Sequence, residues 1–311
     1  MSGLRRWLGW IAPFVISGGA FAFLLTKIEL RAVLESVPAG ALRVGVPALL
    51  IYGAVSLWIE ALSLTRLVAG SHPALGRWTC ARIKAASFPL QLIHYGLGGA
   101  ALAVLIRRRS GLALSDAAGV VVTIAILDLA MLLLLAGVGA ALLATQAPAL
   151  RAGVIGAVCV GIVGGAALLR APVRLGPLER IRGLSFFRAL RTTALPTLLT
   201  VGGLRLAFVA SFIGLGWTLL AAFEIGIPLG DFVVGFAAVA LIAALPIAVS
   251  GLGTGQLALV EIFQHWADPA ALLAYSLTLS LGLILLRAGI GLAFARELTR
   301  EALAATQEGT P

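Results

Sequence analysis

Charged residues are scarce in this chain. Asp, Glu, Lys and Arg make up 12% of its 311 residues, hydrophobic residues make up 60%, and the mean hydropathy is +1.07. Soluble domains carry roughly 25% charged residues, so this sequence cannot cover a water-facing surface. The composition excludes a soluble protein and predicts that lipid surrounds most of the chain.

Cysteine and the signatures of soluble enzymes are also nearly absent. The two cysteines, Cys80 and Cys159, lie far apart, in or beside apolar runs, and therefore predict neither a disulfide framework nor a metal site. The sequence contains no P-loop, no His/Cys metal spacing and no nucleophile elbow. We therefore predict no catalytic residue, no metal and no cofactor, and expect a protein that is not an enzyme.

Acidic residues are few compared with basic ones. The sequence has 13 Asp and Glu against 23 Lys and Arg, which gives a net charge of +10. The basic residues lie in short clusters between apolar runs without interleaved aromatic residues, so we expect no nucleic-acid partner. This pattern is typical of cytoplasmic loops beside anionic lipid head groups.

Long apolar runs, in contrast, are abundant in the sequence. Delimited by the charges around them, eight runs cover residues 7–26, 44–65, 85–106, 117–150, 151–170, 192–223, 231–261 and 269–295. We predict that all are helical, because backbone polar groups in lipid must be satisfied within the segment. The first run resembles a signal peptide, but its 20 uncharged residues are enough for a retained span.

The distribution of basic residues predicts how these runs cross the membrane. If all eight cross, 9 basic residues lie on the cytoplasmic side and 12 outside, which violates the positive-inside rule. If residues 85–106 and 231–261 enter and leave on the same side, 17 lie inside and 4 outside. We therefore predict an all-α, multi-pass protein of the inner cell membrane with six full spans, two re-entrant broken hairpins and both termini in the cytoplasm.

The two predicted hairpins also resemble each other. Five of eight positions match between residues 96–103 and 251–258, half a chain apart, and Pro89 and Pro246 precede the two segments. The sequence therefore predicts a first repeat at 1–150, a second at 151–295 and a cytoplasmic tail at 296–311. Three full spans per repeat would invert the second repeat, and broken segments at matching positions of inverted repeats point to a transport site at the bilayer midplane.

Glycines and a few polar residues mark the candidate site within the hairpins. Glycine permits a tight turn and a close approach to a ligand, although small residues also simply let membrane helices pack. The turn candidates are Gly96, Gly98, Gly99, Gly251, Gly253 and Gly255. The candidate polar lining consists of Gln91, His94, Ser250 and Gln256. Between the repeats, the arginine-rich linker 170–191 is equally consistent with a helix on the inner membrane surface and with a solvated loop.

Four charges interrupt the predicted spans: Glu60, Asp128, Arg205 and Arg287. A charge at the bilayer centre costs at least roughly 2.5 kcal/mol, so each needs a partner or water. Distances from the helix ends place Asp128 level with Arg205 and Glu60 level with Arg287, which predicts two ion pairs. Two interpretations remain open: both pairs are structural, or the arginines bind a lipid phosphate for which the acids are the resting partners.

Most of the chain, roughly from the second apolar run to the eighth, resembles a known family, and the resemblance is clearest in the second hairpin. Residues 245–256, which read LPIAVSGLGTGQ, resemble a pattern in the flippase-like transmembrane region of lysylphosphatidylglycerol synthases and its stand-alone relatives. Weaker similarities are Gly98-Gly99 and the sequence around Asp128. The chain departs from the family pattern at Gln256, where Glu is usual, at Ala100 and Ala101, where Asp is common, and in lacking a basic residue before Asp128 within its helix.

The resemblance implies lipid translocation or lipid handling, and we expect anionic or phosphate-bearing membrane lipids as partners. We expect no aminoacyl-transfer domain, since too few residues follow Arg300. The alternatives are a lipid-presenting component of membrane glycolipid synthesis and a small-solute secondary transporter. A homo-oligomer is compatible with the sequence.

Overall fold

The computed structural model describes most of the chain. The described residues are 26, 29–69, 75–143, 152, 155–156, 158–165, 187–244 and 253–308, with no side chains described beyond Phe294 in the last helix. Within these residues all regular structure is helical. The predicted all-α class is therefore confirmed.

Among the described residues, four helices are long and apolar enough to cross a membrane. They are α3 (Ala41–Leu67), α6 (Leu114–Val138), α11 (Leu195–Ala222) and α14 (Pro269–Glu308), although only the first part of α14 is apolar. They correspond to the second, fourth, sixth and eighth apolar runs and confirm a polytopic membrane protein. The first run, except for Thr26, and much of the fifth run lie outside the described residues. The count of six spans therefore stays a prediction.

Each predicted hairpin contains two short helices. The first consists of α4 (Arg77–Ile93) and α5 (Tyr95–Ser110), and the second of α12 (Leu229–Ala244) and α13 (Thr254–Phe263). The break between α4 and α5 agrees with the prediction for the first segment. Re-entry of the two hairpins into the membrane stays a prediction.

The details of the first hairpin differ from the prediction. Its first helix begins at Arg77 rather than at residue 85. The helix includes Arg82 and Lys84, charged residues that lie before the predicted apolar run. The chain breaks at His94, whose backbone is extended, and not at a glycine. Gly96, Gly98 and Gly99 instead lie in the first turns of α5. The break of the second hairpin, with Ser250 and Gly251, lies outside the described residues.

The remaining described elements are short. They are α2 (Leu30–Glu35), α10 (Arg188–Thr192) and the π-helical segments η1 (Gly139–Leu143) and η2 (Val160–Gly164). Only residues 187–191 of the predicted basic linker are described. Helix α14 continues to Glu308, so helical backbone extends into the segment predicted as a cytoplasmic tail.

Local sequence explains several helix ends. The imidazole Nδ1 of His94 accepts a hydrogen bond of 3.1 Å from the Gly96 amide and caps α5. Residues 107–109, all arginine, occupy the last turn of that helix, where cations are favoured by the helix dipole. Gly111 follows at φ 71°, the left-handed conformation that ends many helices with glycine. A carboxylate oxygen of Asp268 accepts from the Ala270 amide at 2.9 Å and caps α14.

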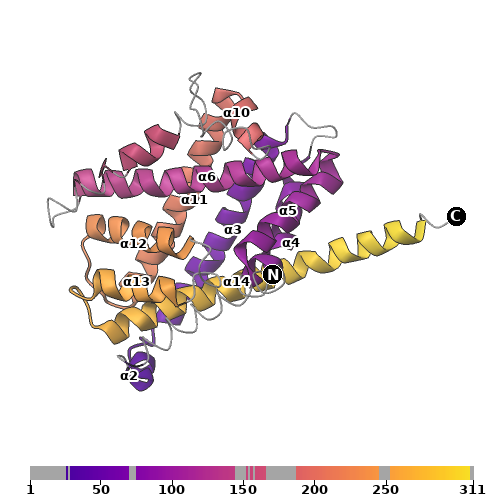
Figure 1. Cartoon of the computed structure of the whole chain (residues 1–311). Coiled ribbons are helices and arrows are strands. Elements are labelled where there is room, and N and C mark those ends of the chain that lie inside the picture. Colours follow the sequence, from indigo (N-terminus) through magenta and orange to yellow (C-terminus); the bar gives the residue numbers. More distant parts are fainter. Residues whose placement is uncertain are drawn as a thin grey trace, which may run out of the picture.

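The long helices frame the molecule (Figure 1). Helices α3 and α11 pack against each other at the centre, with α6 along one side and α14 along the other. The pair α4 and α5 fills one end of this frame, and the pair α12 and α13 fills the other. The centre of the molecule is thus enclosed by both predicted repeats.

Contacts between the two predicted repeats are reciprocal. Helix α4 of the first repeat packs on α14 of the second, and α12 of the second packs on α6 of the first. Within the repeats, the corresponding contacts are those of α5 with α6 and of α13 with α14. A two-fold relation between the repeats predicts this pattern. The inversion of the second repeat across the membrane stays a prediction.

Two large apolar cores hold most of the described helices together. One joins α11, α12, α13 and α14, with Phe232 stacked between Phe236 and Phe263. The other joins α3, α4, α5 and the start of α6. The space between them, near the middle of α3, is where the charged residues lie.

Candidate functional site

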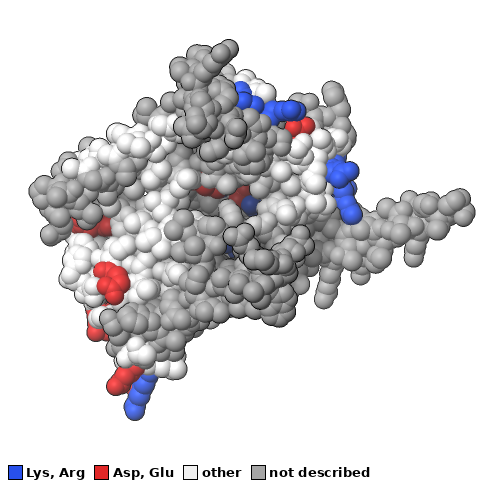
Figure 2. Space-filling model, viewed as in Figure 1, with Lys and Arg blue, Asp and Glu red and all other residues white. Residues whose placement is uncertain are grey.

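A cavity of about 230 Å³ lies between the two cores. Its walls come from seven helices: α3, α4, α5, α6, α11, α12 and α14. In the space-filling view, both acidic and basic atoms are visible at the bottom of a hollow in the middle of one face (Figure 2). The cavity therefore brings charged side chains together between predominantly apolar helices.

Four of these charges form one connected network. The Lys84 ammonium lies 3.0 Å from one carboxylate oxygen of Glu60, and Nη1 of Arg205 lies 3.2 Å from the other. The Nε atom of Arg205 donates to Asp128 at 2.5 Å. The four residues come from four helices, α4, α3, α11 and α6, so the network ties both predicted repeats together.

Arg205 lies at the centre of this network. Its side chain is 0% exposed, and its guanidinium lies over the Phe208 ring at 4.1 Å from the ring centre. Two acids and two bases cancel in net charge, and their mutual attraction offsets the cost of removing them from water. Asp128, at 20% exposed, is the member with the most contact with the cavity space.

The structure agrees with one predicted ion pair and corrects the other. Asp128 is paired with Arg205, as their equal depths predict. Glu60 is paired with Lys84 and Arg205 and not with Arg287. Depth along a helix gives the height of a side chain but not the direction in which it points. Lys84, the charge just before the predicted run that begins at residue 85, lies inside α4.

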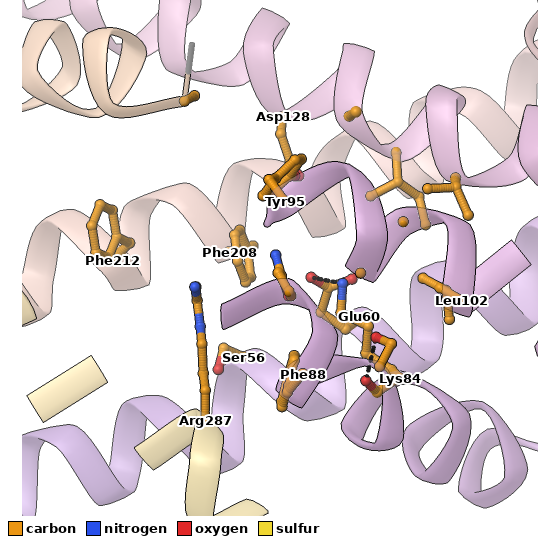
Figure 3. Close-up of a pocket in the computed structure, with 18 of the residues that line it drawn as sticks. Ser56, Glu60, Lys84, Phe88, Tyr95, Leu102, Asp128, Phe208, Phe212 and Arg287 are labelled. Atoms are coloured by element: carbon orange, nitrogen blue, oxygen red, sulfur yellow. Dashed lines mark hydrogen bonds and ion pairs between the residues drawn. The ribbon is translucent and has the colours of Figure 1, made fainter. Parts of the chain in front are cut away.

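Arg287 is left without a carboxylate. It is half-buried in the cavity wall, and no described acid lies within 4 Å of its guanidinium. Its side chain extends from α14 into the cavity beside Ser56 (Figure 3). The hydroxyl of Tyr52 is also close to it. This guanidinium therefore has donor capacity for a ligand.

The other predicted site residues are distributed unevenly. Gln91, Gly98 and Gly99 line the cavity, whereas His94 and Gly96 form the cap of α5 beside it. Gly98 lies so close to α4 that an added Cβ would be 2.6 Å from the Gln91 Cα, so its smallness serves helix packing.

In the second hairpin, the described candidates do not line the cavity. Gln256 accepts from the Gly253 amide at 2.6 Å and donates to the Ser280 hydroxyl at 3.0 Å, which fixes the start of α13. Gly253 adopts φ 85°, a conformation that favours glycine. An added Cβ at Gly255 would make only an ordinary contact with Ala243.

Sequence reasoning missed five residues that contribute to the site: Tyr52, Ser56, Lys84, Tyr95 and Phe208. A signal for three of them exists in the helical period. Tyr52, Ser56 and Glu60 are four residues apart on α3 and share one face, and Lys84, Ser87 and Gln91 share a face of α4. Such polar stripes in apolar helices mark the sides that face the cavity.

Comparison with family models gives one match that covers most of the chain. Residues 10–290 match the model described as the lysylphosphatidylglycerol synthase transmembrane region. The chain belongs to this family. Among curated proteins no match was found. Membership in this family, together with the apolar helices, indicates a multi-pass membrane protein with a role that involves membrane lipids.

Proposed function

We propose that this family member is a flippase-like transporter that moves a phosphate-bearing lipid between the leaflets of the inner cell membrane. The observation that carries the proposal is Arg287, a guanidinium in a cavity among membrane-spanning helices with no described acid as its partner. A planar guanidinium can donate two parallel hydrogen bonds to phosphate oxygens. A charge in this position is costly unless a partner, water or a ligand stabilises it, and a phosphate would supply the opposite charge.

The two sides of the cavity suit an amphiphile. The side formed by α3 and α4 is polar, with Ser56, Ser87 and Gln91 beside the charged network. Apart from Asp128, the side formed by α6, α11 and α12 is apolar. Its lining includes Leu132, Phe212, Ala240 and Ala244. We therefore place the head group at Arg287 and direct the chains toward α12.

Arg205 has a different part in the proposal. Its guanidinium is engaged by Asp128 and Glu60, and no atom of its side chain is exposed to the cavity. A phosphate can reach Arg205 only after Asp128 moves away. We propose that Arg287 makes the first contact with the phosphate and that Arg205 becomes available only in a later step.

A vesicle assay tests this function. Full-length protein is reconstituted into vesicles containing a fluorescent phospholipid, and the loss of fluorescence after adding an impermeant reductant reports movement to the outer leaflet. We expect Arg287→Gln to slow this movement about 10- to 100-fold, because hydrogen bonds to charged groups contribute about 1.5–3 kcal/mol. Arg108→Gln, an exposed change at the end of α5, is the matched control and should match the wild type.

Two outcomes would contradict the proposal. Equal rates for Arg287→Gln and the wild type would remove Arg287 from the mechanism. Binding of the lipid by wild-type protein without any movement between leaflets would instead favour a lipid-presenting component of glycolipid synthesis.

A further inference from the structure

The charges around the cavity do not sum to zero. Glu60, Lys84, Asp128 and Arg205 form a network of two acids and two bases and are neutral as a group. Arg287 is the fifth charged residue of the described site, and it has no described acid as a partner. The described part of the site therefore carries one uncompensated positive charge.

A site of this kind discriminates between ligands by their charge. Apolar walls and the surrounding lipid lower the local dielectric, so any charge left over after binding is expensive. A head group with one negative charge brings the site to neutrality. A head group with two negative charges leaves one surplus negative charge beside acids that are already paired. A zwitterionic head group adds an ammonium, and the described site has no unpaired acid for it.

We infer that the cavity selects lipids whose head group carries a single negative charge, as a phosphodiester does, over phosphomonoester and zwitterionic lipids. This inference rests on the proposed lipid-binding function and narrows its substrate class. A phosphodiester also offers two equivalent non-bridging oxygens, which match the two parallel donors of one guanidinium. A phosphomonoester carries a charge near −2 above its second pKa of about 6.

Three short-chain probes that differ in charge test the selectivity. They are dioctanoyl phosphatidylmethanol, phosphatidic acid and phosphatidylcholine, measured at pH 8 by their effect on the thermal unfolding of full-length protein in detergent. The first two differ by one methyl ester, so size contributes little to the comparison. We expect phosphatidylmethanol to bind about tenfold more tightly than either of the others, because unmatched charge disfavours the wrong partner.

Two variants change the charge of the site in opposite directions. Asp128→Asn raises the charge from one positive to two and should shift the preference toward phosphatidic acid. Arg287→Gln removes the surplus charge and should abolish the preference for phosphatidylmethanol. Arg108→Gln alters the net charge of the protein but not that of the cavity, and should leave the order of the three probes unchanged.

The wild-type comparison decides the inference even if a variant fails to fold. Equal binding of the three probes, or tighter binding of phosphatidic acid, would overturn the charge selectivity while leaving lipid binding intact. Absence of binding by all three would instead count against the proposed function itself. An unchanged order of preference in a folded Asp128→Asn variant would also overturn the inference.

Discussion

At the scale of single residues, the buried charges differ in what they can do. Glu60 has both oxygens engaged, one by Lys84 and one by Arg205, and its side chain is 8% exposed. Such a residue holds helices together and is poorly placed to meet a ligand. Arg287, which faces the same cavity without an acid partner, is the better candidate for ligand contact. Sequence alone could not separate these roles, because all four charges that interrupt the spans look equivalent in it.

The network predicts a specific pattern of stability. Glu60→Gln leaves Lys84 without its buried partner and should destabilise the protein by about 3–5 kcal/mol, the usual cost of breaking a buried pair. Combining it with Lys84→Met removes both charges and leaves Arg205 with Asp128 as a neutral pair. The double variant should therefore recover most of the lost stability in thermal unfolding experiments. Losses that simply add would show that the two residues do not interact.

At the scale of helices, the sequence predicted the helical type of the described elements but not how they face each other. Long apolar runs predict helices because lipid leaves the backbone no other partner, and four of them appear as long helices. The break in the first hairpin was misplaced, since the glycines that suggested a turn serve the packing of α5 on α4. The polar faces of α3 and α4 carried the missing information about orientation.

The contact between α4 and α5 yields the prediction at this scale. An added Cβ at Gly98 would lie 2.4 Å from the Gln91 Cβ and 2.6 Å from its Cα, so Gly98→Ala must push the helices apart. Overpacking of this kind costs about 1–3 kcal/mol, and we expect a corresponding fall in the thermal unfolding temperature. Gly99→Ala is the matched control, because its Cβ would be 3.5 Å from a Val121 methyl carbon, an ordinary contact. Equal stability of the two variants would contradict close packing at Gly98.

At the scale of the whole molecule, charge is distributed unevenly between loops. The loop between α5 and α6 follows residues 107–109, and Arg188 of α10 lies 4.0 Å from Asp116 beside it. The loop between α11 and α12 instead carries Glu224, and Asp268 precedes α14. Basic segments favour the cytoplasmic side, so this distribution predicts a cytoplasmic loop between α5 and α6 and an external loop between α11 and α12.

Cysteine labelling of two exposed glycines tests that orientation. In a background carrying Cys80→Ser and Cys159→Ser, Gly111→Cys lies between α5 and α6 and Gly226→Cys between α11 and α12. With re-entrant hairpins and a cytoplasmic N-terminus, an impermeant thiol reagent added outside intact cells should label Gly226→Cys and spare Gly111→Cys. If all eight apolar runs cross, the two results exchange. Protection of Gly226→Cys together with labelling of Gly111→Cys would therefore rule out the re-entrant arrangement. Without re-entrant hairpins, the two pairs of short helices could not meet at a site in the bilayer midplane.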